Sequence, residues 1–359
     1  MARIGVASSD WFAPDPSRGL SEEVWGGSGW ARVGQYLPYL REQHEVIVGV
    51  LVWDKDHFVI RHEDETSDVD VVLMHRLMHK GLTETVALGR AAGQKIVNDL
   101  DDWYWGLDTS NAAFKASHPK YNDQEDRYSY KGILSKSDLL IVSTPYLADR
   151  VAEWVKADIV VQRNTVDVDR FSVREASDTT CPVVGWVGST AHRSNDLETM
   201  RGILGPMKAA DKIRLMHGGH HLQYPSYAAG IGVEEDDVLF KLPLSSHSNY
   251  PSLMKMDVGI VPLRVTPFNQ AKSYIKGLEY AAAGIPFVAQ SIDAYDELRN
   301  VYDIGLTAKS PKDWVRLLNR LRDPHFRKEM AETNLEMVKA HDVSIGAKPF
   351  VAAINSVIR

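Results

Sequence analysis

Short, nearly unbroken apolar runs alternate along the chain with segments in which apolar residues recur every three or four positions. In the first half, apolar runs cover residues 3–7, 44–52, 69–74, 95–100 and 138–143, and helical spacing covers residues 30–40, 82–92, 124–135 and 145–155. Strands that are apolar throughout are typical of parallel sheets covered on both faces. The pattern therefore predicts an α/β fold with a doubly wound sheet.

The same alternation restarts at residues 181–189 and predicts a second sheet. Its further strands are expected at residues 213–216, 238–242, 257–263 and 287–289, with helices at residues 197–204 and 250–256. Beyond Pro311 the spacing is helical to the end of the chain. The sequence thus predicts two doubly wound domains followed by helices.

Length and composition agree with a two-domain soluble enzyme. The chain has 359 residues, of which 44% are hydrophobic and 25% charged, and this length exceeds the usual size of one core. The longest apolar run, residues 46–53, is far shorter than the ~20 residues of a membrane span, and the N-terminus lacks a signal-peptide core. We therefore expect a cytoplasmic protein. The net charge of −7 argues against a broad nucleic-acid-binding surface.

Phosphate-binding and ribose-binding residue types are concentrated in residues 266–290. A helix is expected to begin with Asn269 as its N-cap and to end near residue 283, before the stop signals Gly284 and Pro286. Because this helix follows a buried strand, its N-terminus is expected at the edge of the sheet where ligands bind.

Three charged residues, Lys272, Lys276 and Glu279, are spaced four and three apart and are expected to share one face of this helix. The helix macrodipole opposes a lysine in the first turn by ~0.3–1 kcal/mol, and an anionic ligand would reverse that effect. A diphosphate would be held by backbone N–H groups, Ser273 and Lys272, while Glu279 accepts hydrogen bonds from ribose hydroxyls. The alternative is a solvated helix face with a Lys276–Glu279 pair.

The order of these residues, KSxxKxxEYxxxGxP from Lys272 onward, resembles the donor-site signature of GT-B glycosyltransferases, particularly the family 4-like group. In that family a helix glutamate binds the ribose of the nucleotide, and Glu279 matches it. Many members carry a second glutamate eight residues earlier, where this chain has Ala271. The resemblance implies a variant donor site that Asn269, Lys272 and Ser273 approach instead.

A second segment, RNTVDVDRF at residues 163–171, resembles the PNGVDxxxF connector between the two domains of that family. The resemblance implies a GT-B architecture, in which two Rossmann-like domains face a central cleft. The first domain, residues 1–170, would hold the acceptor, and residues 171–340 would hold the nucleotide sugar. A C-terminal helix at residues 341–359 would cross back to the first domain.

A glycine-rich loop with Gly26 and Gly27 opens the first expected helix. Glycines at such a position let the backbone approach a ligand closely, although they also make a simple flexible loop. In the resembled family, a glycine-rich loop here lies against the donor phosphates or the acceptor.

The acidic segment NDLDDWYW, residues 98–105, follows an expected strand and so lies at its carboxyl end. One interpretation is a metal site resembling the DxD motif of GT-A transferases, and another is an acidic helix N-terminus. We favour a third, in which Asp101 or Asp102 acts as a base or orients the acceptor and the aromatic rings stack on a sugar. GT-B enzymes generally need no metal, so none is expected. His75, after the third strand, is expected to face the same cleft.

Two loops of the second half are further candidates for the donor site. Arg193 follows a strand and would clamp the diphosphate opposite Lys272. The HGGHH run at residues 217–221, with Gly218 and Gly219, would line the nucleobase pocket. A metal site and simple surface histidines are the alternatives, although no carboxylate or cysteine accompanies the run.

These observations predict a glycosyltransferase that moves a sugar from a UDP- or GDP-sugar to an acceptor. The resemblance implies retention of anomeric configuration without a metal. A nucleotide-sugar epimerase of the same fold and a non-catalytic Rossmann-type nucleotide-binding protein are the competing hypotheses, and no GxGxxG fingerprint follows the first strand. The acceptor, whether glycan, lipid, protein or modified nucleobase, and the oligomeric state stay open.

Overall fold

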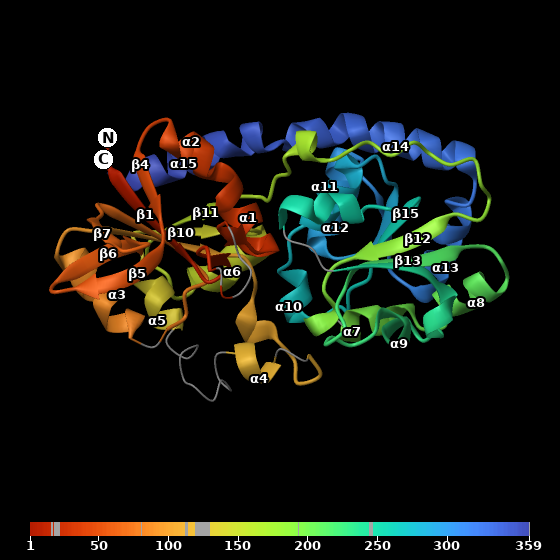
Figure 1. Ribbon diagram of the computed structural model, residues 1–359, viewed down its shortest axis with the longest axis horizontal. Helices are drawn as coiled ribbons and strands as arrows, with labels where there is room; N and C mark the ends of the chain where they lie inside the picture. Colours follow the sequence, from red (N-terminus) through yellow and green to blue (C-terminus); the bar gives the residue numbers. More distant parts are fainter. Residues whose placement is uncertain are drawn as a thin grey trace.

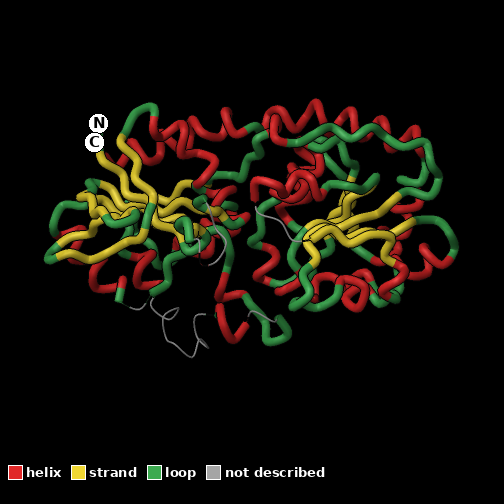
Figure 2. Tube along the Cα trace, viewed as in Figure 1, coloured by secondary structure: helices red, strands yellow, loops and turns green. Residues whose placement is uncertain are grey.

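Two lobes, each built on a six-stranded parallel sheet, make up the protein (Figure 1). The computed structural model describes residues 1–15, 17, 22–79, 81–111, 114–118, 130–192, 194–243 and 247–358. In both lobes helices flank the strands (Figure 2). The expectation of two doubly wound sheets is confirmed.

The first sheet reverses its strand order between β1 and β8. Across this sheet the strands are β11 (Asp158–Val161), β10 (Leu139–Val142), β9 (Lys95–Leu100), β8 (Val71–His75), β1 (Arg3–Ser8) and β4 (Glu45–Val48). From β1 the chain moves to one side to form β4, then to the other side for the remaining strands. Ligands of open α/β sheets bind at the carboxyl ends of the strands beside such a reversal.

The second sheet has its reversal between β12 and β15. Its strands are β14 (Val238–Pro243), β13 (Arg214–His220), β12 (Val183–Val187), β15 (Val258–Val261), β16 (Phe287–Gln290) and β17 (Leu306–Ala308). The apolar runs that predicted strands are the buried ones, since every residue of β12, β15 and β16 is buried. A site between the lobes can therefore draw on the reversal points of both sheets.

The apolar run at residues 44–52 is two strands rather than the one expected. It divides at Gly49, where a Cβ would lie 2.4 Å from the carbonyl oxygen of Arg61. After β4, strand β5 (Val50–Asp54) joins β6 (His57–His62) and β7 (Glu65–Asp68) in an antiparallel sheet. Phe58 and Ile60 of β6 pack into the core of the first lobe, so this ribbon covers part of the parallel sheet.

Helices of the first lobe are α1 (Gly27–Arg32), α2 (Leu37–Arg41), α3 (Leu82–Ala91), α4 (Phe114–Ser117), α5 (Tyr130–Ser135) and α6 (Pro145–Ala152). Those of the second half are α7 (Ser194–Leu197), α8 (Leu204–Ala209), α9 (Tyr227–Ile231), α10 (Pro267–Gln270), α11 (Ile275–Ala282), α12 (Asp293–Tyr302), α13 (Pro311–Arg320), α14 (Pro324–Val338) and α15 (Val343–Ile358). A 3-10 helix, η9 (His247–Leu253), replaces the α-helix expected at residues 250–256, and it contains Pro251. Residues 124–129 of another expected helix lie outside the described residues. Over the described ranges, no helix combines the length and the apolar character needed to span a membrane.

The last two helices run along both lobes (Figure 1). Helix α14 lies on the second lobe, and α15 packs on the first sheet, where the ring of Phe350 stacks on Tyr36 at a centroid distance of 4.6 Å. The two crossings between the lobes are paired, because Val166 N donates to His341 O and Val343 N donates to Val166 O, each at 3.0 Å. The expected crossing of the C-terminal helix to the first domain is confirmed.

Truncating Phe350 tests how strongly α15 holds the first lobe. Because Phe350 is fully buried, Phe350→Ala is expected to lower the unfolding free energy by about 3–5 kcal/mol. Ile345 on the same helix is 49% exposed, so Ile345→Ala should change it by no more than about 0.5 kcal/mol. Urea denaturation measures both variants. Equal effects would show that packing of α15 on the first sheet contributes little.

Candidate functional site

A cleft of about 860 Å³ lies between the two lobes, at the carboxyl ends of both sheets. Among its lining residues are Gly26, Gly27, Ser28, Arg76, Asp101 and Asp102 from the first lobe and Gly219, Lys272, Ser273, Lys276 and Glu279 from the second. Three residues predicted for the site do not line it: His75, Gly218 and Asn269. Arg193 lies outside the described residues.

The helix expected over residues 269–283 is broken into two. Thr266 is the N-cap of α10, and its side chain accepts a hydrogen bond from Asn269 N, so Asn269 is not the cap. Thr266 followed by Pro267 forms a complete helix start that precedes Asn269. The chain leaves helical geometry after Gln270, and α11 begins only at Ile275.

This break changes the position of the donor-site candidates. Lys272 and Ser273 precede α11, and only Lys276 and Glu279 lie on it. The N-cap residue Tyr274 makes no side-chain capping bond, and the first turn of α11 has no acidic residue. Ser273, Ile275 and Lys276 at this end of α11 line the cleft, and the first turn has no acidic side chain to offset the positive end of the helix dipole.

Glu279 is held in place by two polar neighbours. Tyr250 donates from its hydroxyl to Glu279 Oε2 at 2.8 Å, and Lys276 Nζ donates to Tyr250 Oη at 2.7 Å. The Lys276 ammonium is 3.6 Å from Glu279 Oε2. Burial raises the pKa of Glu279, while Lys276 and Tyr250 oppose that rise. Tyr250 carries no sequence signal, because its segment reads as an ordinary amphipathic helix.

Lys272 and Ser273 connect the second lobe to the first. Lys272 Nζ lies 2.9 Å from Asp102 Oδ1 and 4.1 Å from the ring centroid of Phe268. Ser273 Oγ accepts a hydrogen bond from Asn164 Nδ2 at 3.0 Å. The segment before α11 is thus fastened to the acidic loop and to the connector between the lobes.

The three carboxylates of the acidic segment do not converge on a common point. Asp99 is fully buried and forms a bidentate pair with Arg32, whose Nη2 is 2.7 Å from Asp99 Oδ2. Asp101 faces Ser28, and Asp102 faces Lys272 across the cleft. Within the described ranges, no group of three or more His, Cys, Asp or Glu side chains is arranged to hold a metal ion.

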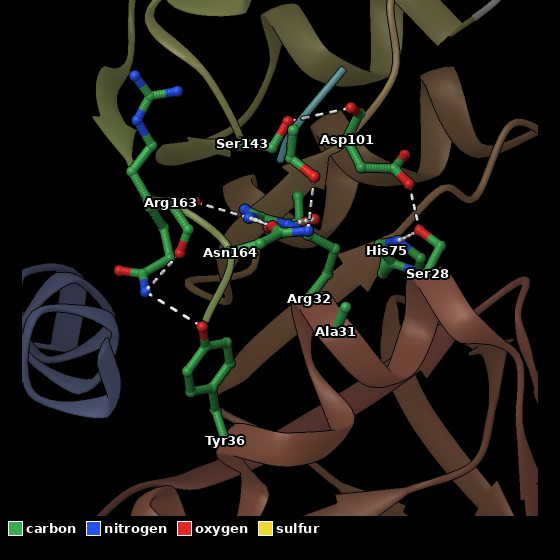
Figure 3. A network of polar contacts seen from close by, with 12 residues as sticks. Ser28, Ala31, Arg32, Tyr36, His75, Asp101, Ser143, Arg163 and Asn164 are labelled. Atoms are coloured by element: carbon green, nitrogen blue, oxygen red, sulfur yellow. Dashed lines mark hydrogen bonds and ion pairs between the residues drawn. The ribbon is translucent and has the colours of Figure 1, made fainter. Parts of the chain in front are cut away.

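Arg32 joins the acidic segment to the connector (Figure 3). Besides its pair with Asp99, its Nη1 donates to Gln162 O and to Asn164 Oδ1, each at 2.6 Å. A buried guanidinium needs such partners, because an unpaired buried charge costs several kcal/mol. Arg32 therefore fixes α1 and its glycine-rich loop relative to the connector.

His75 is fully buried and does not line the cleft. Its ring lies next to Ser28, which does (Figure 3). Its Nδ1 is 2.8 Å from Ser8 Oγ and its Nε2 is 3.3 Å from Ser28 Oγ, and Ser28 in turn donates to Asp101 Oδ2. Burial lowers the pKa of His75 to about 3, so the ring is neutral at physiological pH. Ser28, within the GGSG loop, is the site residue that sequence reasoning could have added.

Arg76 and Asp101 form the charged centre of the first-lobe side. Arg76 Nε is 3.7 Å from Asp101 Oδ1, and the guanidinium lies 5.7 Å from the ring centroid of Tyr104. Burial disfavours the charged form of Asp101, but Arg76 and other polar neighbours outweigh it and lower the pKa of the carboxyl. Arg76 has a φ of +57°, a left-handed conformation that is unusual for a residue with a side chain. Asp101 is consequently an ionised hydrogen-bond acceptor and a weak base.

The four glycines predicted for the site differ in their local surroundings. A Cβ on Gly26 would lie 2.2 Å from Asp10 Oδ1, whereas a Cβ on Gly27 would meet nothing within 4 Å. Gly219 has a φ of +107° and lines the cleft, while Gly218 is buried inside β13. Gly26, Gly27 and Gly219 all line the cleft. Gly26 is required by its contact with Asp10 and Gly219 by its left-handed backbone, whereas the open space beside Gly27 leaves the backbone accessible to a ligand.

His217 of the HGGHH run is packed against aromatic rings and does not line the cleft. Its ring stacks on Trp186 and Tyr227 at centroid distances of 5.3 and 5.0 Å, and its Nε2 is 3.0 Å from Gly188 O. Burial lowers the pKa of His217 to about 4. The stack supports Trp186, Gly188 and Gly219, which line the second-lobe end of the cleft.

Comparison with solved structures shows the GT-B fold. Sucrose-phosphate synthase from Thermosynechococcus elongatus aligns with a TM-score of 0.65 at 15% identity, covering 100% of this chain and 99% of that one. A glycosyltransferase from Rickettsia africae gives 0.62 at 12% identity, covering 100% and 99%. A UDP-forming trehalose-phosphate synthase from Burkholderia xenovorans gives 0.53 at 12%, covering 81% and 75%. No family model and no curated protein sequence matches the chain.

The buried His75 predicts a pH dependence of stability. Its pKa falls from about 6.5 in the unfolded chain to about 3 in the folded protein, so the unfolded state binds more protons between these values. Stability due to His75 is complete above pH ~6.5 and is lost as the pH falls toward 3. Between pH 7 and 5.5 the wild type is expected to lose about 1 kcal/mol more unfolding free energy than His75→Gln.

Urea denaturation at the two pH values measures this difference. His325, which is exposed on α14, provides the control, because His325→Gln removes an imidazole from the surface. Equal pH-dependent losses in wild type and His75→Gln would contradict a neutral, buried His75.

Proposed function

We propose that this protein is a glycosyltransferase that moves a sugar from a UDP- or GDP-sugar to an acceptor, with retention of configuration and without a metal. The observation that carries the proposal is the distribution of charge in the cleft. The second lobe contributes two lysines, Glu279 and the N-terminus of α11, and the first lobe contributes Arg76, two carboxylates and a glycine-rich loop. In this assignment, residues 171–340 bind the donor and residues 1–170 bind the acceptor.

The second-lobe residues of the cleft are suited to the diphosphate, the ribose and the base of a nucleotide. Lys272, Ser273 and the N-terminus of α11 are suited to the diphosphate, because cations and backbone N–H groups bind phosphate oxygens. Glu279 lies further along the helix, where its carboxylate would accept hydrogen bonds from ribose hydroxyls. The end of β13 at Gly219, beside the stacked Trp186, is suited to the flat face of a base.

In the reaction, the bond between sugar C1 and the β-phosphate oxygen breaks, and an acceptor oxygen bonds to C1. The acceptor proton passes to the departing phosphate oxygen, which makes stabilisation of that oxygen the main catalytic requirement. Lys272, Lys276 and the N-terminus of α11 would supply that stabilisation and take the place that a metal has in other transferases. Asp101, ionised and held by Ser28, would orient the acceptor hydroxyl.

A panel of ligands tests the function. Thermal shift with UDP-, GDP-, ADP- and dTDP-sugars in the presence of EDTA, beside NAD, is expected to show stabilisation by a UDP- or GDP-sugar. NMR of the sugar released from that donor to water should show the anomer of the donor first. Stabilisation by NAD alone would refute the transferase, an inverted anomer would refute retention, and release of an epimerised sugar would indicate an epimerase.

Two variants separate the phosphate and ribose roles. Lys272→Met is expected to weaken binding of the nucleoside diphosphate by about tenfold or more but not binding of the nucleoside, because only the diphosphate carries the charge. Glu279→Gln is expected to weaken both by a similar factor, because both contain ribose. Isothermal calorimetry with uridine and UDP, or guanosine and GDP, gives the comparison. Glu332→Gln, on the exposed side of α14, is the control, and unchanged affinities in folded Glu279→Gln would remove its ribose role.

A further inference from the structure

The segment that precedes α11 is packed on the first lobe. Ala271 is fully buried among apolar side chains of that lobe, and Thr144 Oγ donates to Ala271 O at 3.1 Å. Phe268 lies beside Tyr104, and a Cβ on Gly106 would come within 2.7 Å of Phe268 N. The acidic loop of the first lobe and the donor segment of the second therefore meet directly at the cleft.

Asp102 is the carboxylate of the acidic loop that faces the second lobe. Its Oδ1 is 2.9 Å from Lys272 Nζ, and the two side chains are only 19% and 11% exposed. Asp99 and Asp101 are turned toward Arg32, Ser28 and Arg76 of their own lobe. Asp102 is thus placed beside the group that, under the proposed function, holds the diphosphate.

The covalent structure of a nucleotide sugar would place its sugar beside Asp102 when the diphosphate is bound at Lys272. The sugar is bonded through C1 to the β-phosphate, so hydroxyls near C1 lie within one sugar ring of the group that binds that phosphate. A carboxylate has four acceptor positions and can take hydrogen bonds from two hydroxyls while it keeps its pair with Lys272. Ala271, adjacent to Lys272, offers no polar side chain and is buried away from the cleft.

We propose that Asp102 binds hydroxyl groups of the donor sugar and selects sugars that carry them near C1 over deoxy sugars. The assignment rests on the proposed function, because it places the diphosphate at Lys272. A mostly buried carboxylate that loses a hydroxyl partner pays a desolvation penalty, so a missing hydroxyl is discriminated against strongly. In this arrangement residues of the second lobe bind the nucleotide, and Asp102 of the first lobe binds the sugar attached to it.

The experiment compares each nucleotide with its nucleotide sugar by isothermal calorimetry. The probes are UDP and UDP-glucose, GDP and GDP-mannose, and the singly deoxygenated analogues of the sugar that binds. In Asp102→Asn the ratio of the nucleotide-sugar Kd to the nucleotide Kd is expected to rise about tenfold or more. Removal of the recognised hydroxyl should weaken wild-type binding about tenfold but affect the variant much less. Asp149→Asn, an exposed charge on α6, controls for net charge.

Each outcome decides between specific possibilities. A variant that binds the nucleotide with the wild-type ratio and the wild-type response to deoxygenation overturns the role of Asp102, while the proposed function stands. Loss of nucleotide binding in both Asp102→Asn and Asp102→Glu would assign Asp102 to holding Lys272 and would also overturn it. If the wild type binds neither nucleotide pair, the proposed function itself fails and the sugar role fails with it.

Discussion

The buried ion pair between Arg32 and Asp99 is the interaction on which the geometry of the cleft depends. Both side chains are almost completely excluded from water, so each requires the other and further hydrogen bonds. Arg32 uses its remaining donors on Gln162 O and Asn164, and Asn164 reaches Ser273 of the second lobe. One guanidinium thereby links the glycine-rich loop, the acidic loop, the connector and the donor segment.

Both lobes bring charged side chains to the cleft, and the two sets meet at Lys272 and Asp102. Lysines and an uncapped helix N-terminus lie on the second lobe, where an anion is favoured. Glu279 lies on the same lobe, while the first lobe contributes Arg76 and the carboxylates Asp101 and Asp102, of which Asp102 bridges to Lys272. Because the two signs meet across the cleft, each lobe is incomplete as a site without the other.

Much of the fold followed from sequence, because parallel strands buried on both faces are apolar throughout and stand out in the chain. The same signal failed at residues 44–52, since an apolar run continues through Gly49 although the chain leaves the sheet there. The prediction of Asn269 as a helix N-cap was also wrong. Thr266 and Pro267 begin α10 earlier, and the chain leaves the helix before α11 begins. The site residues after strands were foreseeable by topology, and Ser28 by its place in the glycine-rich loop, whereas Tyr250 became visible only through its contact with Glu279.

The sequence by itself determined the two sheets, the order of their strands along the chain and the chemical groups that follow them. These features depend on local periodicity and on neighbours close in the chain. Only the tertiary structure decided that Lys272 pairs with Asp102, that His75 lies buried beside Ser28, and that Ala271 packs into the opposite lobe. Such contacts join residues far apart in sequence, and they are set by the packing of loops between lobes, which a pattern of polar and apolar positions does not encode.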